Sequence, residues 1–142
     1  MISVDTNILL YALNPECAEF GPARELLETL KRSTEVVLCE QVLVELYLLL
    51  RNPKVVGHPQ TAAGAVAICQ AFRSNPRWRI VEGGPVMAQV WSLAMAEDFP
   101  RRRIIDARIA LTLQHHGVRR VYTRNRRDFL PFGFDHVIDP IA

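Results

Sequence analysis

The sequence lacks the features that mark several common classes of protein. Its three cysteines, Cys17, Cys39 and Cys69, are widely spaced and form no CxxC pair or Cys/His cluster, which argues against a disulfide framework or a zinc site. No apolar run reaches the roughly 18 residues of a membrane-spanning helix. The N-terminus has no basic segment, and Asp5 interrupts its apolar residues, so it does not resemble a signal peptide. We therefore expect a cytoplasmic protein with no membrane segment.

Phosphate-binding loops are missing as well. Neither GxGxxG nor GxxxxGK[ST] occurs, which argues against nucleotide binding through a glycine-rich loop. The first predicted strand is followed by Asp5, Thr6 and Asn7, and not by the paired DxD of small-molecule phosphohydrolases. The chain also has no internal repeat or low-complexity segment.

Lysine is scarce, whereas arginine is abundant. The formal net charge is only +2, but arginines crowd the stretch 101–127, where Asp106 is the only acid. Guanidinium groups bind phosphate through their fork of donors. A local basic region in a nearly neutral protein suits binding to a polyanion. It could equally be a solvated surface or a contact site for an acidic partner protein.

The hydrophobic pattern alternates between short strands and helices. It predicts strands at 2–4, 36–38, 78–81, 121–122 and 136–138, helices at 5–13, 22–32, 40–51, 61–73, 85–97 and 104–116, and a helical turn within 125–129. Gly117 is expected to cap the helix that precedes it. The helix 40–51 is apolar almost all round, so we expect it to be buried. The alternation predicts an α/β protein, one domain over 1–142, with a central parallel sheet flanked by helices.

Three carboxylates lie in positions that need an explanation. Asp5 ends the first strand, and open α/β sheets bind ligands beyond the carboxyl ends of their strands, although Asp5 also suits the N-cap of the next helix. Glu45 lies among leucines and valines, where an acid is costly to bury without a partner, such as an arginine. Asp106 lies near the start of an apolar helix, where the helix dipole alone favours a carboxylate.

The fourth candidate region is the stretch YTRNRRDF, where polar residues follow a later strand. It contains Thr123, Asn125 and Asp128, residue types that strand-to-helix turns also favour for backbone reasons. Carboxylates converging at one sheet edge would repel one another and raise their pKa values. A divalent cation relieves that repulsion, and hard oxygen ligands favour Mg²⁺ or Mn²⁺ over zinc. Such a site can activate water for attack on a phosphodiester.

Taken together, these segments resemble a known family. VDTNILLYAL, LVELYLLL, IIDARIALTLQHHGV and YTRNRRDF occur in order between residues 4 and 129, and the ordered set resembles the PIN-domain ribonucleases, more narrowly the VapC-type toxins of bacterial toxin–antitoxin pairs. The resemblance implies a metal-dependent endoribonuclease that uses Mg²⁺ or Mn²⁺. It also implies that Asp5, Glu45 and Asp106 are the catalytic, metal-binding acids.

The resemblance further assigns supporting residues. Thr6 and Thr123, together with Asn7, would support Asp5 and the substrate phosphate. The family's fourth acid falls here on Asn125, which is neutral, so either Asn125 or Asp128 fills that position. Independently of the resemblance, the arginine-rich stretch beside Asp106 and Asn125 would hold the RNA backbone, through Arg101, Arg102, Arg103, Arg124, Arg126 and Arg127.

The resemblance also implies partners. The substrate would be a structured RNA such as tRNA or rRNA, a cognate antitoxin would block the acidic pocket, and the protein would form a homodimer. The neutral Asn125 leaves one alternative, a PIN-like module that binds RNA or a partner protein without cutting.

Overall fold

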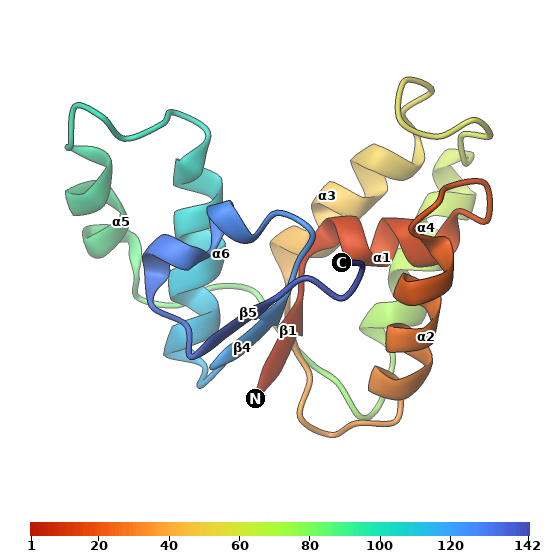
Figure 1. Ribbon diagram of the computed structural model, residues 1–142, viewed down its shortest axis with the longest axis horizontal. Helices are drawn as coiled ribbons and strands as arrows, with labels where there is room; N and C mark the ends of the chain where they lie inside the picture. The colour runs from red at the N-terminus through yellow and green to blue at the C-terminus, as the bar shows by residue number, and fades with distance from the viewer.

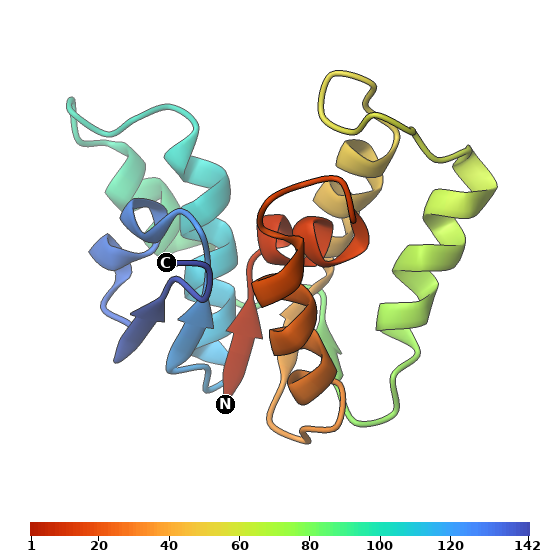
Figure 2. The same ribbon diagram turned by 45° about the vertical axis from the view of Figure 1, so that its right-hand side comes forward.

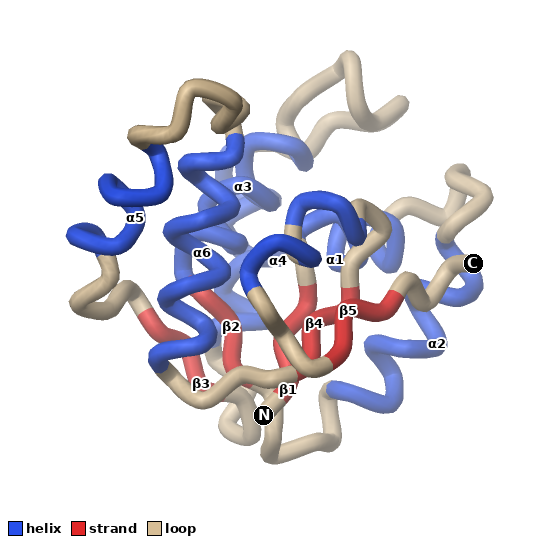
Figure 3. Tube along the Cα trace, turned by 60° about the vertical axis from the view of Figure 1, so that its left-hand side comes forward, coloured by secondary structure: helices blue, strands red, loops and turns tan.

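Five short parallel strands form the centre of the molecule. The computed structural model describes all 142 residues, and its strands are β1 (Ile2–Val4), β2 (Val37–Cys39), β3 (Arg79–Val81), β4 (Arg120–Tyr122) and β5 (His136–Ile138). One ladder has the order β1-β4-β5 and the other pairs β2 with β3, with all pairings parallel. A bridge between Ile2 and Val36 joins the two, so the strands follow the order β3-β2-β1-β4-β5 (Figure 3). The predicted parallel sheet is confirmed.

Helices cover the sheet on both sides. They are α1 (Thr6–Leu13), α2 (Phe20–Leu30), α3 (Glu40–Leu50), α4 (Ala62–Arg73), α5 (Met87–Ala94) and α6 (Arg103–His115), followed by the 3₁₀ turns η1 (Arg126–Asp128) and η2 (Leu130–Phe132). α6 and α5 lie on one side of the strands, and α1 and α2 lie on the other (Figures 1 and 2). None of the helices has the length and apolar character needed to cross a membrane.

The core lies between the sheet and these helices. Strand residues Val4, Leu38 and Val121 are buried against Ile8 of α1 and Leu113 of α6, within one cluster of 27 buried apolar residues. Parallel strands covered on both faces carry near-continuous apolar sequence, as in the run VLC of β2. In β1 the apolar Ile2 and Val4 flank Ser3, a small residue that is fully buried. This packing fixes the edge of the sheet from which the polar side chains project.

The predicted elements are all present, with shifted boundaries. α2 begins at Phe20, because Pro22 is tolerated within the first turn of a helix, and α5 ends at Ala94 rather than near 97. Gly117 follows α6 with φ +85°, as its predicted capping role requires.

The prediction that the helix 40–51 is buried all round was wrong. Val44 is 47% exposed and Leu48 is 61% exposed on α3. The helix packs against α1, α4 and β2, and these neighbours cover only part of its circumference. Apolar composition therefore did not reveal that α3 keeps an open face.

Candidate metal-dependent active site

The pairing of β1 with β4 brings Asp5 beside Thr123. Val4 is in register with Tyr122, and the Asp5 N–H extends the ladder by donating to the Tyr122 carbonyl at 2.8 Å. Asp5 directly follows β1 and Thr123 directly follows β4, so the two residues lie side by side. The Thr123 hydroxyl is fully buried and donates to Asp5 Oδ2 at 2.7 Å.

Asp5 has two roles that its sequence position left open. Its Oδ1 accepts a hydrogen bond from the Thr6 N–H at 2.8 Å, and Asp5 is the N-cap of α1. Its Oδ2 meets Thr123 at the carboxyl edge of the sheet. Capping the helix therefore does not remove Asp5 from the site, because the cap fixes one oxygen and Thr123 orients the other.

Thr6 connects the first strand end to Glu45. Its hydroxyl is buried where α1 crosses α3 and donates to Glu45 Oε2 at 2.9 Å. The Thr6 side chain therefore supports Glu45, whereas its support of Asp5 comes from the backbone N–H. No arginine pairs with Glu45 among the salt bridges of the structure, so its partner is this hydroxyl.

Glu45, Asp106 and Asp128 face one open cavity of about 630 Å³. Asp106 comes from the first turn of α6 and Asp128 from η1. Pro100, Arg102, Arg103 and Ile105 complete the lining. Asp5 does not line this cavity, yet it is close enough for its charge to act on Asp106.

The crowding of carboxylates changes their acidity. Burial raises the pKa of Asp106 to about 7, the charges of Asp128, Asp5 and Glu45 add to the rise, and Arg103 opposes it. This mutual effect is what the sequence predicted for acids gathered at one sheet edge.

Asp5 and Glu45 respond in the same direction. Burial raises the pKa of Asp5 to about 6, against the hydrogen bonds from Thr123 and Thr6, and the charges of Glu45 and Asp128 contribute to the rise. Burial also raises the pKa of Glu45, although the Thr6 hydroxyl opposes it. The site therefore holds its protons more tightly than exposed carboxylates do.

The donor set fits a hard divalent cation. Carboxylate oxygens that raise one another's pKa are the environment in which a cation relieves the most repulsion, and Mg²⁺ and Mn²⁺ bind through such oxygens and waters. With the side chains as they stand, no three acidic, histidine or cysteine residues meet closely enough to hold one ion. The fit therefore rests on donor chemistry, with Asp5, Glu45, Asp106 and Asp128 as the residues that would converge.

The two candidates for the fourth position, Asp128 and Asn125, have different surroundings. Asp128 lines the acidic cavity and its charge acts on both Asp5 and Asp106. Asn125 is exposed, and its N–H donates to the Thr123 hydroxyl at 3.0 Å. Asn7 accepts from the Arg124 N–H at 3.4 Å, so Asn7 supports the loop after β4 and not Asp5 itself.

The six arginines predicted to bind RNA fall into three pairs with different surroundings. Arg102 and Arg103 line the acidic cavity, and Arg101 and Arg127 are exposed. The other two are occupied within the protein: Arg124 Nη1 donates to Asp139 Oδ2 at 2.8 Å, and Arg126 Nε donates to the Val137 carbonyl at 3.0 Å. Asp139 was missed from the sequence, because no motif marks it and its partner is 15 residues away.

Comparison with known proteins agrees with this arrangement. The family model of the PIN domain matches residues 2–133, which includes every acid that faces the site. The chain therefore belongs to the PIN-domain family.

A curated relative narrows the assignment. Ribonuclease VapC24 of Mycobacterium tuberculosis is 51% identical over 142 residues, which is all of this chain and 98% of the relative. This identity places the chain in the VapC group of PIN-domain proteins, as the resemblance predicted.

Solved structures share the fold. VapC20 of Mycobacterium tuberculosis, described as a sarcin–ricin loop cleaving toxin, superposes with a TM-score of 0.71 at 24% identity and covers 94% of this chain and 96% of its own. A toxin–antitoxin complex from Klebsiella pneumoniae has a TM-score of 0.60 at 20% identity, covering 99% of this chain and 98% of its own. At these identities the likeness concerns the fold alone.

Proposed function

We propose that the protein is an endoribonuclease toxin that depends on Mg²⁺ or Mn²⁺ and hydrolyses RNA phosphodiester bonds. The observation that carries the proposal is that Asp5, Glu45, Asp106 and Asp128 lie near one another at the carboxyl edge of the sheet. Burial raises the pKa values of Asp5, Glu45 and Asp106 there, and neighbouring carboxylate charges add to the rise at Asp5 and Asp106. The 51% identity with a VapC ribonuclease supports the same activity.

The residues of the chain have distinct roles in this proposal. Asp5, Glu45 and Asp106 hold the cation, with Asp128 in the fourth position. When bound, the cation supplies Lewis-acid activation of water and neutralises charge at the phosphodiester. Thr123 and Thr6 fix the orientations of Asp5 and Glu45 before substrate arrives.

We infer that the substrate is a structured RNA such as tRNA or rRNA. Arg102 and Arg103 at the cavity bring positive charge to an otherwise acidic site, and phosphate contacts of this kind position a nucleic acid without reading its bases. The description of VapC20 as a toxin that cleaves the sarcin–ricin loop supports an rRNA target.

We also propose two protein partners, a cognate antitoxin and a second copy of this chain. The antitoxin would block the acidic pocket by placing an arginine in it, and the toxin–antitoxin complex among the structural neighbours supports such a partner. The exposed Val44 and Leu48 on α3 offer apolar surface for a protein contact. Light scattering of the purified chain tests the homodimer.

The test of the activity is cleavage of RNA by the wild type, Asp5→Asn and Asp106→Asn. We expect metal-dependent cutting by the wild type and none by either variant, with unchanged circular dichroism. Full activity in a folded variant would refute the site assignment. Calorimetric titration with Mn²⁺ separates the alternative of a non-catalytic binding module, which would bind the ion weakly or not at all.

A further inference from the structure

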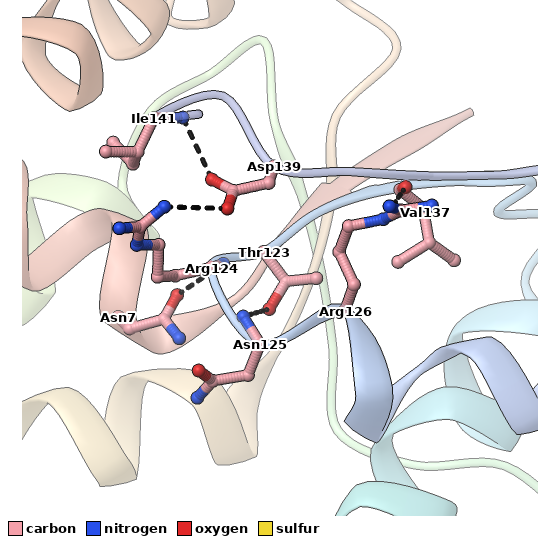
Figure 4. A network of polar contacts seen from close by, with 8 residues as sticks. All are labelled: Asn7, Thr123, Arg124, Asn125, Arg126, Val137, Asp139 and Ile141. Carbon is pink, nitrogen blue, oxygen red and sulfur yellow. Dashed lines mark hydrogen bonds and ion pairs between the residues drawn. The ribbon is translucent and has the colours of Figure 1, made fainter.

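Three contacts hold the loop after β4 against the edge strand β5 and the residue that follows it. The Thr123 N–H donates to the Ile138 carbonyl at 2.9 Å. Arg126 Nε donates to the Val137 carbonyl at 3.0 Å. Between these two, Arg124 Nη1 donates to Asp139 Oδ2 at 2.8 Å (Figure 4). The residues that support Asp5 are therefore attached to the C-terminal segment of the chain.

Asp139 is itself held firmly. Its side chain is only 14% exposed, and its second oxygen, Oδ1, accepts from the Ile141 N–H at 2.9 Å. Ile141 packs against the main core. Burial acts to raise the pKa of Asp139, but the Ile141 N–H and the Arg124 guanidinium outweigh it and the pKa is lowered. Asp139 therefore remains an anchored, charged acceptor for Arg124.

A continuous chain of contacts leads from Asp139 to Asp5. Arg124, whose guanidinium meets Asp139, donates its N–H to Asn7 Oδ1 at 3.4 Å. The following Asn125 N–H donates to the Thr123 hydroxyl at 3.0 Å. The same hydroxyl donates its proton to Asp5 Oδ2, 2.7 Å away. The conformation of residues 123–125 thus sets the direction of a hydrogen bond to Asp5.

We propose that the segment Asp139–Ala142 is a clamp on this loop and that Asp139 is a positioning residue for Asp5, acting through Arg124 and Thr123. The clamp lies outside residues 2–133, which the family model matches. Its effect on metal binding rests on the proposed function of Asp5. A preorganised ligand loses less conformational freedom on binding, so a released loop weakens the affinity of the site for a cation.

The clamp is tested first without metal. We compare the wild type with Asp139→Asn, Arg124→Gln and the double variant. Glu28→Gln, which weakens two solvent-exposed ion pairs to Arg24 and Lys31, is the matched control. Hydrogen exchange is followed at the amides of Thr123, Arg124 and Asn125 in EDTA. We expect faster exchange at these amides in all three clamp variants and wild-type exchange in the control.

The link to Asp5 is tested by calorimetric titration with Mn²⁺. Mutating a residue that contacts a metal ligand typically changes metal affinity by about 10- to 100-fold. Asp139 contacts Arg124 and not Asp5 itself, so its effect should be smaller. We therefore expect about a 3- to 10-fold weaker affinity for either single variant. Because both substitutions break the same contact, the double variant should be no weaker than the single ones. The reversed pair, Arg124→Asp with Asp139→Arg, should recover part of the affinity.

Each result decides the proposal. Unchanged exchange at residues 123–125 in folded Asp139→Asn protein would overturn the clamp. Faster exchange with unchanged Mn²⁺ affinity would overturn the positioning role, because Asp139 would then only stabilise the loop. A wild type that binds no Mn²⁺ would instead refute the proposed function, and the exchange data would still decide whether the clamp exists.

Discussion

Replacing Asp5 by asparagine is expected to abolish cleavage and at the same time to stabilise the metal-free protein. The pKa of Asp5 rises from 3.8 to about 6 in the folded chain, so ionised Asp5 costs about 3 kcal/mol of folding free energy near neutral pH, at about 1.4 kcal/mol per unit. The amide keeps the capping oxygen, since Asn and Asp cap helices equally well. It is a weaker acceptor for Thr123, which costs about 1 kcal/mol. The net gain is therefore about 2 kcal/mol.

The pH dependence follows from the direction of the shift. Because the folded pKa lies above the unfolded one, the folded state binds more protons between these two values, and stability falls as pH rises through this window. The full penalty is present above about pH 6 to 7 and falls to about 0.5 kcal/mol at pH 4. The advantage of Asp5→Asn should therefore disappear at pH 4.

Urea denaturation in EDTA at pH 7.5 and pH 4 measures both effects. The exposed Asp98→Asn is the matched control, and we expect it to change the free energy of unfolding by less than about 0.5 kcal/mol at either pH. With Mn²⁺ at pH 7.5 the wild type should gain stability and Asp5→Asn should gain little. Two results would refute the conclusion that the buried charge of Asp5 destabilises the metal-free protein. One is an Asp5→Asn variant less stable than the wild type at pH 7.5, and the other is a stability difference between the two that does not depend on pH.

Three further predictions test other parts of the structure. Glu45→Gln should abolish cleavage and remain folded, because the Thr6 hydroxyl keeps an acceptor, as circular dichroism and an RNA cleavage assay would show. Asp128→Asn should raise the Mn²⁺ concentration for half-maximal cleavage about tenfold or more, while Asn125→Ala changes it less; equal effects would remove Asp128 from the fourth position. Trp78→Phe should lower the free energy of unfolding by about 1–3 kcal/mol, because Nε1 donates to the Leu30 carbonyl at 2.9 Å. The activity per folded molecule should be unchanged in this variant.

The strands and the acids were predictable because local chemistry determines them. Short runs with β-branched residues, such as Ile2–Val4, favour a strand in a sheet covered on both faces, and an acid directly after such a strand lies at its carboxyl end. Glu45 stood out because its neighbours on the helix are apolar. These predictions use only the sequence immediately before and after each residue.

The remaining features depend on contacts between distant parts of the chain. The open face of α3 follows from which elements pack against it, and no pattern within 40–51 contains that information. Charge composition assigned Arg124 and Arg126 to RNA, but the guanidinium of Arg126 donates to Val137 of the edge strand and that of Arg124 donates to Asp139, just after the strand. Asp139 lies beyond every motif, and its contact with Arg124 exists only because β5 pairs with β4.

The most direct test of the proposal that this protein is a metal-dependent ribonuclease is cleavage of total tRNA and of a fluorogenic RNA by the purified chain. The assay is run with Mg²⁺, with Mn²⁺ and with EDTA, and with Asp106→Asn in parallel. The account predicts cutting with either metal, none in EDTA, and none by the variant. Cutting in EDTA, or equal cutting by a folded Asp106→Asn protein, would contradict it.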